Sequence, residues 1–495
     1  MFKNIKVKIA ILTLIVFTYG CVSDEGNYDY NAINEFKVTG IEKEYTVYTG
    51  DYFKISPNLN PTIDDGSDSN RYEYKWVAVN PAKLAIESRT LISTTKDFDG
   101  ILKLPPAKYT VYYFIKDKVT GVEWQQPTFT LNVVSSIYEG WLVIGDVDGK
   151  ARLDMVSIIP NVPTARIITD VLDASGSALK LSGKAVDVDC VTQAVGTTYG
   201  IYVTASESGT SRIDPDSFSW VQSQNIAYET VGGAFATNFA VDFMKSASSG
   251  ENLIYSKGDI FSYYRVYQVK YGLPQNKLNT ETKNFYAAPF IAENGGGLGS
   301  PIFYDRDNRR FVRYNVSTSV CSAMPPVTAS ASVLDWSNTN SDLIYMTTSA
   351  FNSFENFAVL KNVSTGKYSL LRFSRALAQN YFKEILNAPD FDKATKFAVS
   401  PDAGYLFYVV GGKLYEYDNG TQSAKLMLDK GSEEITYIEF HSKSKTNAKN
   451  LVVGSYDGKV GKLELFSVPP VNGDLVLVNS YTGLCKIVDV AFRAR

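Results

Sequence analysis

The sequence predicts an all-β protein in two parts, a β-sandwich followed by a ring of small repeated sheets. The composition favours strands, because 33 tyrosines and 27 phenylalanines accompany only 6 methionines, and aromatic side chains suit the pleated, half-buried surface of a sheet. Residues 37–135 show short alternating strand patterns, and residues 136–495 show a looser repeat of strand, polar turn and strand. A chain of 495 residues is also too long for a single core.

Residues 1–20 have the order of a signal peptide. Three lysines within the first eight residues precede an apolar run over 9–17, and Gly20-Cys21 ends the segment. The apolar run is about half of the roughly 20 residues that a membrane-spanning helix needs. We therefore expect the segment to be cleaved and not to fold with the rest of the chain.

The Gly20-Cys21 ending resembles the lipobox of bacterial lipoproteins, although Thr18 replaces the Leu that this family favours, and Tyr19 is bulky. The resemblance implies that Cys21 is acylated and becomes the new N-terminus. Lipid chains on Cys21 would then hold the protein on a membrane. Cleavage at another site is the alternative.

The residues that follow the cysteine are acidic and polar. Ser23, Asp24 and Glu25 resemble the surface-export signal of Bacteroidetes lipoproteins, which implies an outer-membrane protein exposed at the cell surface. A solvated acidic tether over 21–36 explains the same residues without any export role. Both interpretations leave this segment outside the folded domains.

The first predicted domain, 37–135, has the pattern of an Ig-like β-sandwich, with strands expected at 44–48, 71–77, 108–117 and 129–134. It resembles the PKD-like domains of bacterial surface proteins. Tyr74-x-Trp76 stands where that family has a core tryptophan, and 106–121 resembles its G-x-Y-x-V…D-x-x-x-G ending, with Ala107-Lys108 in place of the usual Gly. We therefore expect Trp76 in the core, with a ligand-stacking tryptophan as the alternative.

The second predicted domain, 136–495, repeats an apolar strand, a polar turn and a second strand, at 333–346, 397–409, 241–257 and 435–454, with further strands at 258–261 and 457–463. This unit resembles a β-propeller blade, and the version with Ser400-Pro401-Asp402 resembles TolB-type blades. At about 50 residues per blade, seven blades fit the length, with six and eight as alternatives. We expect the strand at 487–492 to complete the first blade and close the ring. Only 361–385 shows a long helical period.

Taken together, nearly the whole chain resembles the PKD-like family of Bacteroidetes lipoproteins. The resemblance implies an accessory lipoprotein of SusC/SusD-type transporters, the TonB-dependent channels with a lipoprotein lid, whose cargo is often peptide. It implies a protein that binds oligopeptide or another nutrient polymer beside the transporter, without catalysis and without a cofactor. The alternative is a lipid-anchored hydrolase of glycans or peptides that uses paired carboxylates.

Charge and histidine content exclude several other classes of function. The formal net charge is −3 and Lys and Arg form no run beyond Arg309-Arg310, so nucleic acid is not an expected partner. His441 is the only histidine, so His-rich zinc sites cannot be assembled within one copy, and a Ser-His-Asp triad would need His441 itself. Because it follows a strand pattern at 437–440 and precedes a polar loop, we expect a solvated residue at a strand end.

The remaining chemistry-bearing residues have structural explanations. Asp146 and Asp148 resemble part of a calcium loop, but a hairpin turn at Asp148-Gly149 explains them, and we expect no metal site. The glycine-rich segment 293–300 lacks the lysine of a phosphate-binding loop and is expected to be a flexible loop. We expect Cys190, Cys321 and Cys485 to be buried small hydrophobic residues that form at most one disulfide. We expect core or interface packing for Trp141, Trp220 and Trp336. The sequence names no ligand-binding or catalytic residue.

Overall fold

The computed structural model describes residues 33–84, 87–160, 162–192, 198–246, 251–293, 300–327 and 333–494. The predicted signal peptide, Cys21 and the export residues Ser23, Asp24 and Glu25 lie outside these ranges. The chain divides into two compact units, 1–135 and 136–495. In the described residues the only α-helices are single turns, α2 (Val171–Ala174) and α3 (Phe351–Phe354), and the rest of the regular structure is almost entirely strand. The all-β prediction is confirmed.

In the described residues of the first unit, eight strands form two sheets. One sheet has the order β1-β8-β6-β3-β4, with β7 beside β6, and the other pairs β2 with β5. Along β6 every second residue from Tyr109 to Asp117 is buried, which is the pattern of a sheet with one face on a core. The strands are β1 (Glu44–Tyr48), β2 (Tyr52–Ile55), β3 (Tyr72–Val79), β4 (Arg89–Ser93), β5 (Phe98–Ile101), β6 (Ala107–Asp117), β7 (Glu123–Gln125) and β8 (Phe129–Val134).

Trp76 lies at the centre of the core of this unit. Its side chain is fully buried, its indole N–H donates to the Thr95 carbonyl oxygen at 2.9 Å, and its ring stacks on Tyr113 with 4.2 Å between centroids. The prediction that Trp76 is a core residue is confirmed. At the end of β6, hydrogen bonds from Arg71 and the backbone lower the pKa of Asp117 to about 2, so its carboxylate holds the following turn.

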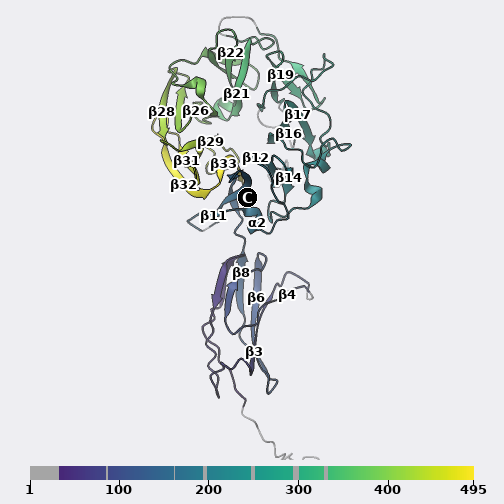
Figure 1. The fold of residues 1–495 in the computed structure, drawn as a ribbon, viewed down its shortest axis with the longest axis vertical. Helices are drawn as coiled ribbons and strands as arrows, with labels where there is room; N and C mark the ends of the chain where they lie inside the picture. Colours follow the sequence, from purple (N-terminus) through teal and green to yellow (C-terminus); the bar gives the residue numbers. More distant parts are fainter. Residues whose placement is uncertain are drawn as a thin grey trace, which may run out of the picture. The chain divides into compact units, whose positions relative to one another are not determined.

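In the described residues of the second unit, seven small antiparallel sheets follow one another in chain order around a ring in Figure 1. The first combines β9 (Glu139–Val147), β10 (Lys150–Ile158) and β11 (Arg166–Ile168) with the last strand, β33 (Lys486–Arg493). The second to fourth sheets are β12 (Ala185–Thr192), β13 (Thr198–Ala205) and β14 (Gly209–Ile213); β15 (Phe243–Ser246), β16 (Glu251–Ser256) and β17 (Asp259–Tyr264); and β18 (Ile302–Asp305), β19 (Arg310–Asn315) and β20 (Val320–Ala323).

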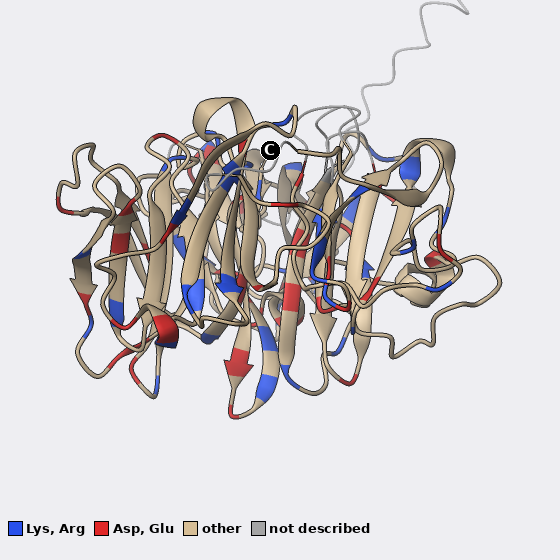
Figure 2. Ribbon diagram, turned by 90° about the horizontal axis from the view of Figure 1, so that it is seen from above, with Lys and Arg blue, Asp and Glu red and all other residues tan. Residues whose placement is uncertain are grey.

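The fifth to seventh sheets each have four strands. They are β21 (Ser341–Ser349), β22 (Glu355–Asn362), β23 (Tyr368–Phe373) and β24 (Gln379–Glu384); β25 (Lys396–Val399), β26 (Leu406–Val410), β27 (Lys413–Asp418) and β28 (Ser423–Asp429); and β29 (Glu434–Phe440), β30 (Asn450–Tyr456), β31 (Gly461–Ser467) and β32 (Val476–Leu484). In an edge-on view the strands run between two faces of loops, and basic and acidic residues are interspersed over both (Figure 2).

Apolar side chains fill the space between every two successive sheets. Seven clusters of buried residues are each shared by two neighbouring sheets, including a cluster between the seventh and first sheets that contains Trp141, Leu463 and Phe492. Each of these sheets therefore packs against a neighbouring sheet on both of its faces. The ring is held by the same hydrophobic burial that stabilises ordinary sheet packing.

The two ends of this unit meet in the first sheet. β33 pairs antiparallel with β9, with Val490 opposite Val143 and Phe492 opposite Trp141. This pairing covers an edge of β9 that would otherwise present unpaired backbone groups. The prediction that 487–492 completes the first sheet of the repeat is confirmed.

Other expectations from the sequence meet mixed outcomes. The hairpin turn is confirmed, because Asp148 and Gly149 have φ of 50° and 75° between β9 and β10, as a primed two-residue turn requires. Cys190, Cys321 and Cys485 are buried and free. The helical period at 361–385 is wrong: this segment contains β23 and β24, and consecutive residues of β23 are buried because both faces of its sheet are covered. Trp141, within β9, and Trp336 are buried as expected, and Trp220 is half-buried.

Candidate functional site

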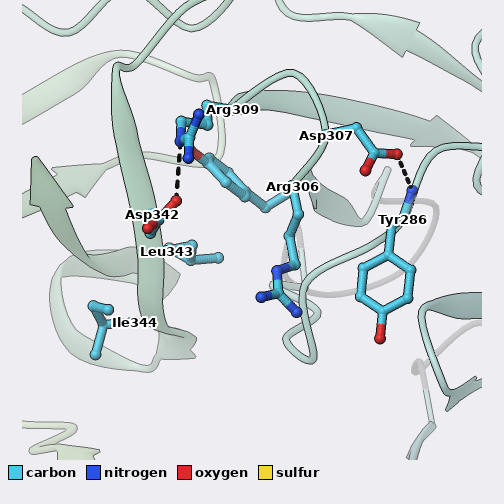
Figure 3. Close-up of a pocket in the computed structure, with 8 residues that line it drawn as sticks. Tyr286, Arg306, Asp307, Arg309, Asp342, Leu343 and Ile344 are labelled. Carbon is cyan, nitrogen blue, oxygen red and sulfur yellow. Dashed lines mark hydrogen bonds and ion pairs between the residues drawn. The ribbon is translucent and has the colours of Figure 1, made fainter. Parts of the chain in front are cut away.

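A polar pocket lies between the fourth and fifth sheets, where β18 ends and β21 begins. Its volume is about 700 Å³, and Figure 3 shows the side chains that line it. The fourth sheet and the segment before it contribute Tyr286, Tyr304, Arg306, Asp307 and Arg309, and the fifth sheet contributes Asp342, Leu343 and Ile344. This volume lies within the range of small-ligand pockets, and half of the lining residues are charged.

The turn that carries Arg306 is anchored by a buried aspartate. Asp305 ends β18 and is fully buried; its carboxylate accepts from the Asn308 backbone N–H at 3.1 Å and from Arg310 Nε at 2.7 Å. The same turn is joined to the preceding segment, because the Arg306 N–H donates to the Tyr286 carbonyl at 2.9 Å and the Tyr286 N–H donates to Asp307 Oδ2 at 2.8 Å. Tyr286 and Arg306 are therefore held side by side by one backbone bond and by the Asp307 carboxylate.

Arg306 presents its guanidinium to the pocket without an anionic partner. The guanidinium carbon lies 5.3 Å from the centroid of the Tyr286 ring, and in Figure 3 the group extends into the space between Leu343 and Tyr286. The described residues offer it no side-chain hydrogen bond or ion pair. The cation over the ring is a weak contact of about 0.5–1 kcal/mol at an exposed site, so the guanidinium stays available to a ligand.

The opposite wall of the pocket is neutral in charge. Arg309 Nε lies 3.0 Å from Asp342 Oδ1, so these two charges compensate each other. The Tyr304 hydroxyl bonds to Thr339 at 2.6 Å, and burial raises the pKa of Tyr304 to about 12, so it is a neutral wall residue. Leu343 and Ile344 add an apolar surface. The pocket thus combines the Arg306 guanidinium, the Asp307 carboxylate bonded to a backbone N–H, one aromatic ring and an apolar side.

A second group of charged side chains, here called the inner-strand cluster, comes from β12, β15, β33, β29 and the residues that follow β29. Lys443 Nζ lies 2.8 Å from Asp189 Oδ1, and Lys245 Nζ lies 3.8 Å from Glu293 Oε1. The cluster consists of Asp187, Asp189, Lys245, Glu439, His441, Lys443 and Asp489.

Two carboxyl groups of the inner-strand cluster face each other. Asp187 is 6% exposed, and its Oδ2 has no donor among the described residues, while Asp489 Oδ2 accepts from the Val188 N–H at 2.9 Å. Burial, followed by the charge of Asp489, raises the pKa of Asp187 well above its usual range, and burial, followed by the charge of Glu439, raises that of Asp489. Burial and mutual repulsion therefore disfavour the state in which both carboxyl groups are ionised.

His441 follows β29 directly, but the expectation of a solvated residue is wrong. It is half-buried; its ring lies edge-on to Trp141 at 5.2 Å, and its Nε2 lies 2.9 Å from the Tyr437 hydroxyl. The same hydroxyl donates to Glu439 Oε2 at 2.7 Å. Burial lowers the pKa of His441. Trp141 belongs to the first sheet and His441 follows the seventh, so the two rings meet because these sheets are neighbours. The sequence around His441 does not indicate this contact.

The other predicted positions carry no site in the structure. Asp146 Oδ1 accepts from the Ala185 N–H at 2.8 Å and Asp148 occupies the hairpin turn, so both have structural roles. No group of three or more His, Cys, Asp or Glu side chains in the described part of the chain could hold a metal ion. Most of the glycine-rich segment, 294–299, lies outside the described residues. The sequence did not identify Arg306 and Tyr286; the concentration of charge at 305–310 was the only local signal.

Comparisons with solved structures give matches of low identity. A quinonprotein alcohol dehydrogenase-like protein from Bacteroides thetaiotaomicron is 11% identical with a TM-score of 0.47, covering 93% of this chain and 100% of its own. A protein from Lactobacillus plantarum is 12% identical with a TM-score of 0.44, covering 72% and 100%. A DUF4784 family protein from Bacteroides caccae is 10% identical with a TM-score of 0.29, covering 93% and 98%. At these TM-scores we infer nothing about this chain from them.

No curated protein matches the chain. Across the described ranges, no helix has the length and apolar character needed to cross a membrane. A family model does match part of the sequence, beginning at Cys21 and running through the sandwich to the residues just before β12. Residues 21–182 of this chain match the model of the PKD-like family.

Proposed function

We propose that this protein is a surface-exposed lipoprotein that binds a nutrient ligand, most simply an oligopeptide, beside a SusC/SusD-type transporter in the outer membrane. We further propose that residues 136–495 form a seven-bladed β-propeller that carries the binding site. The observation that carries the proposal is the pocket in which Arg306 extends an uncompensated guanidinium beside the Tyr286 ring. A cation and an aromatic surface on a hydrogen-bonded turn suit the binding of a polar organic ligand, because little order has to be created on binding.

The lipoprotein part of the proposal rests on the N-terminal sequence. Basic residues, an apolar run and Gly20-Cys21 follow in the order of a lipoprotein signal, and the family match begins at Cys21. Changing Cys21 to Ser should release the protein from membranes and remove the acyl mass from its N-terminal peptide, as measured by fractionation and mass spectrometry. An acylated, membrane-bound Cys21→Ser protein would contradict this part.

The surface location and the partner need separate tests. Changing Asp24 and Glu25 to Ala should reduce labelling of intact cells by an extracellular protease or antibody, and unchanged labelling would exclude the export role. A tagged copy purified from native outer membranes should bring down a SusC/SusD-type pair. A Cys21→Ser copy is the control, because it would lack the anchor that places it beside the transporter.

The binding activity is tested with the purified mature protein. Peptide and glycan pools are incubated with it, and bound and cleaved products are measured by mass spectrometry. Retention of peptides without cleavage is the expected result. If the protein retains only glycans, its ligand is a glycan and not a peptide. If it retains neither pool, the proposal is contradicted.

A hydrolase is the second candidate, favoured by the facing carboxyl groups of Asp187 and Asp489. Perturbed carboxyl pairs serve as acid and base in many hydrolases. In that case the peptide or glycan pool would be cleaved, and Asp187→Asn would abolish cleavage while leaving the fold intact. The low exposure of Asp187 favours a structural role for the pair, so we expect no turnover.

A further inference from the structure

We propose that the Arg306 guanidinium binds a carboxylate, specifically the free C-terminal carboxylate of a peptide, in the pocket between the fourth and fifth sheets. This inference rests on the proposed function in taking peptides as the ligand. It goes further by naming the group that is recognised and the residue that recognises it.

The first step is the availability of the cation. Neighbouring arginines are occupied by carboxylates: Arg310 bonds to Asp305 and Glu281, each at 2.7 Å, and Arg309 lies 3.0 Å from Asp342. Arg306, in the same turn, has the Tyr286 ring as its side-chain contact. A planar guanidinium with its donors unused matches the two oxygens of a carboxylate in a bidentate geometry.

The second step is the charge of the ligand. Asp307 directs its carboxylate to the Tyr286 N–H, and Asp342 compensates Arg309. The pocket therefore has one cation to offer, and two aspartates line it. Among the described residues Asp307 has no cationic partner, so a ligand with a single negative charge is repelled less there than the doubly charged form of phosphate.

The third step is the surface around the carboxylate. Tyr286 is 45% exposed, and Leu343 and Ile344 line the other side of the pocket, so an apolar side chain next to the carboxylate has surfaces to contact. Gly258 lies directly against the Tyr286 ring, and a side chain at Gly258 would overlap that ring. The absence of a side chain at Gly258 thus gives Tyr286 its place beside Arg306.

The experiment compares two forms of the same ligand. A pool of N-acetylated tetrapeptides is prepared with free C-terminal carboxylates and, separately, as C-terminal amides, and each pool is titrated into the mature protein by calorimetry. The acids should bind at least about tenfold more tightly than the amides, since a hydrogen bond to a charged group is worth about 1.5–3 kcal/mol. Arg306→Ala should remove the difference, and Arg306→Lys should retain only part of it.

Arg375→Ala is the matched control, because Arg375 is also exposed and lies over an aromatic ring, 6.0 Å from the Phe354 centroid, but does not line the pocket. It should keep the full preference for acids. Arg306 is an exposed turn residue without side-chain bonds to described residues, so Arg306→Ala should keep the melting temperature of the unmodified protein.

The outcomes separate the two proposals. Equal binding of acids and amides, or an acid preference that survives in Arg306→Ala, would overturn the carboxylate site while leaving peptide binding in place. At pH 8, inorganic phosphate should displace the peptide acids less well than acetate does. Equal displacement by the two anions would overturn the preference for a single charge. Failure of both peptide pools to bind would refute oligopeptide as the ligand, and the carboxylate site with it.

Discussion

Replacing Glu416 by glutamine should reduce the loss of stability as the pH rises from acidic to neutral values. Glu416 lies in β27 and is 1% exposed. It stands opposite Phe407 on the neighbouring strand, which belongs to the apolar cluster between the sixth and seventh sheets. Neither carboxyl oxygen has a hydrogen-bond partner among the described residues. Lys425, opposite Glu416 on β28, bonds to Asp474 at 2.7 Å instead.

The size of the effect follows from the shift in pKa. Burial raises the pKa of Glu416 from 4.5 to about 7. A carboxyl group with a raised pKa binds its proton more tightly in the folded state, so stability falls as pH rises from about 4.5 to about 7. At about 1.4 kcal/mol per pKa unit, ionisation of Glu416 costs roughly 2–3 kcal/mol of unfolding free energy between pH 5 and pH 8.5. Glutamine has no charge and avoids this loss.

The assay is urea denaturation of the unmodified protein and of Glu416→Gln at pH 5 and pH 8.5. The stability of the variant relative to the unmodified protein should rise by roughly 2–3 kcal/mol between the two pH values, with unchanged dependence on urea. The Asp187–Asp489 pair titrates in both proteins and cancels in the difference. Glu207→Gln is the control, because Glu207 is an exposed glutamate in a turn and water solvates its carboxylate. A difference independent of pH would refute the reasoning.

Three further predictions test other parts of the structure. Gly145→Ala places a side chain where the Lys486 carbonyl lies, so β33 and β9 should lose hydrogen-exchange protection; unchanged protection would contradict the closing role of β33. Trp76→Ala should cost about 3–5 kcal/mol in the sandwich, and in calorimetry only one of two transitions should move; a shift of both would mean that the units do not unfold independently. His441→Ala should leave peptide affinity within about twofold, because the pocket residues do not include His441; a larger loss would place the ligand at the inner-strand cluster.

Much of the fold could be predicted because its determinants are local. The alternation in β6, the aromatic strand around Trp76 and the Asp148-Gly149 turn each depend on neighbouring residues, so period and turn chemistry predict them. The closing strand at 487–492 was predictable because a ring of repeats leaves one edge to be covered. The segment 361–385 was misread because alternation weakens where both faces of a sheet are buried.

The candidate site could not be predicted in the same way. Arg306 and Tyr286 lie together because the turn after β18 bonds to the segment at Tyr286, and no repeat in the sequence marks this contact. Asp342 lines the same pocket from the next sheet. A glutamate in a strand such as β27 is expected to face solvent, yet Glu416 is buried because the seventh sheet covers it.

By itself the sequence determined the all-β class, the position of the core tryptophan and the strand that completes the first sheet. Its N-terminal pattern also supplies the hypothesis of acylation at Cys21. Tertiary structure alone decided which charges meet: Asp187 lies beside Asp489, and Trp141 packs on His441, although each pair is about three hundred residues apart in the chain. The physical reason is that periodicity records which face of a strand is buried, whereas ring closure decides what lies against that face.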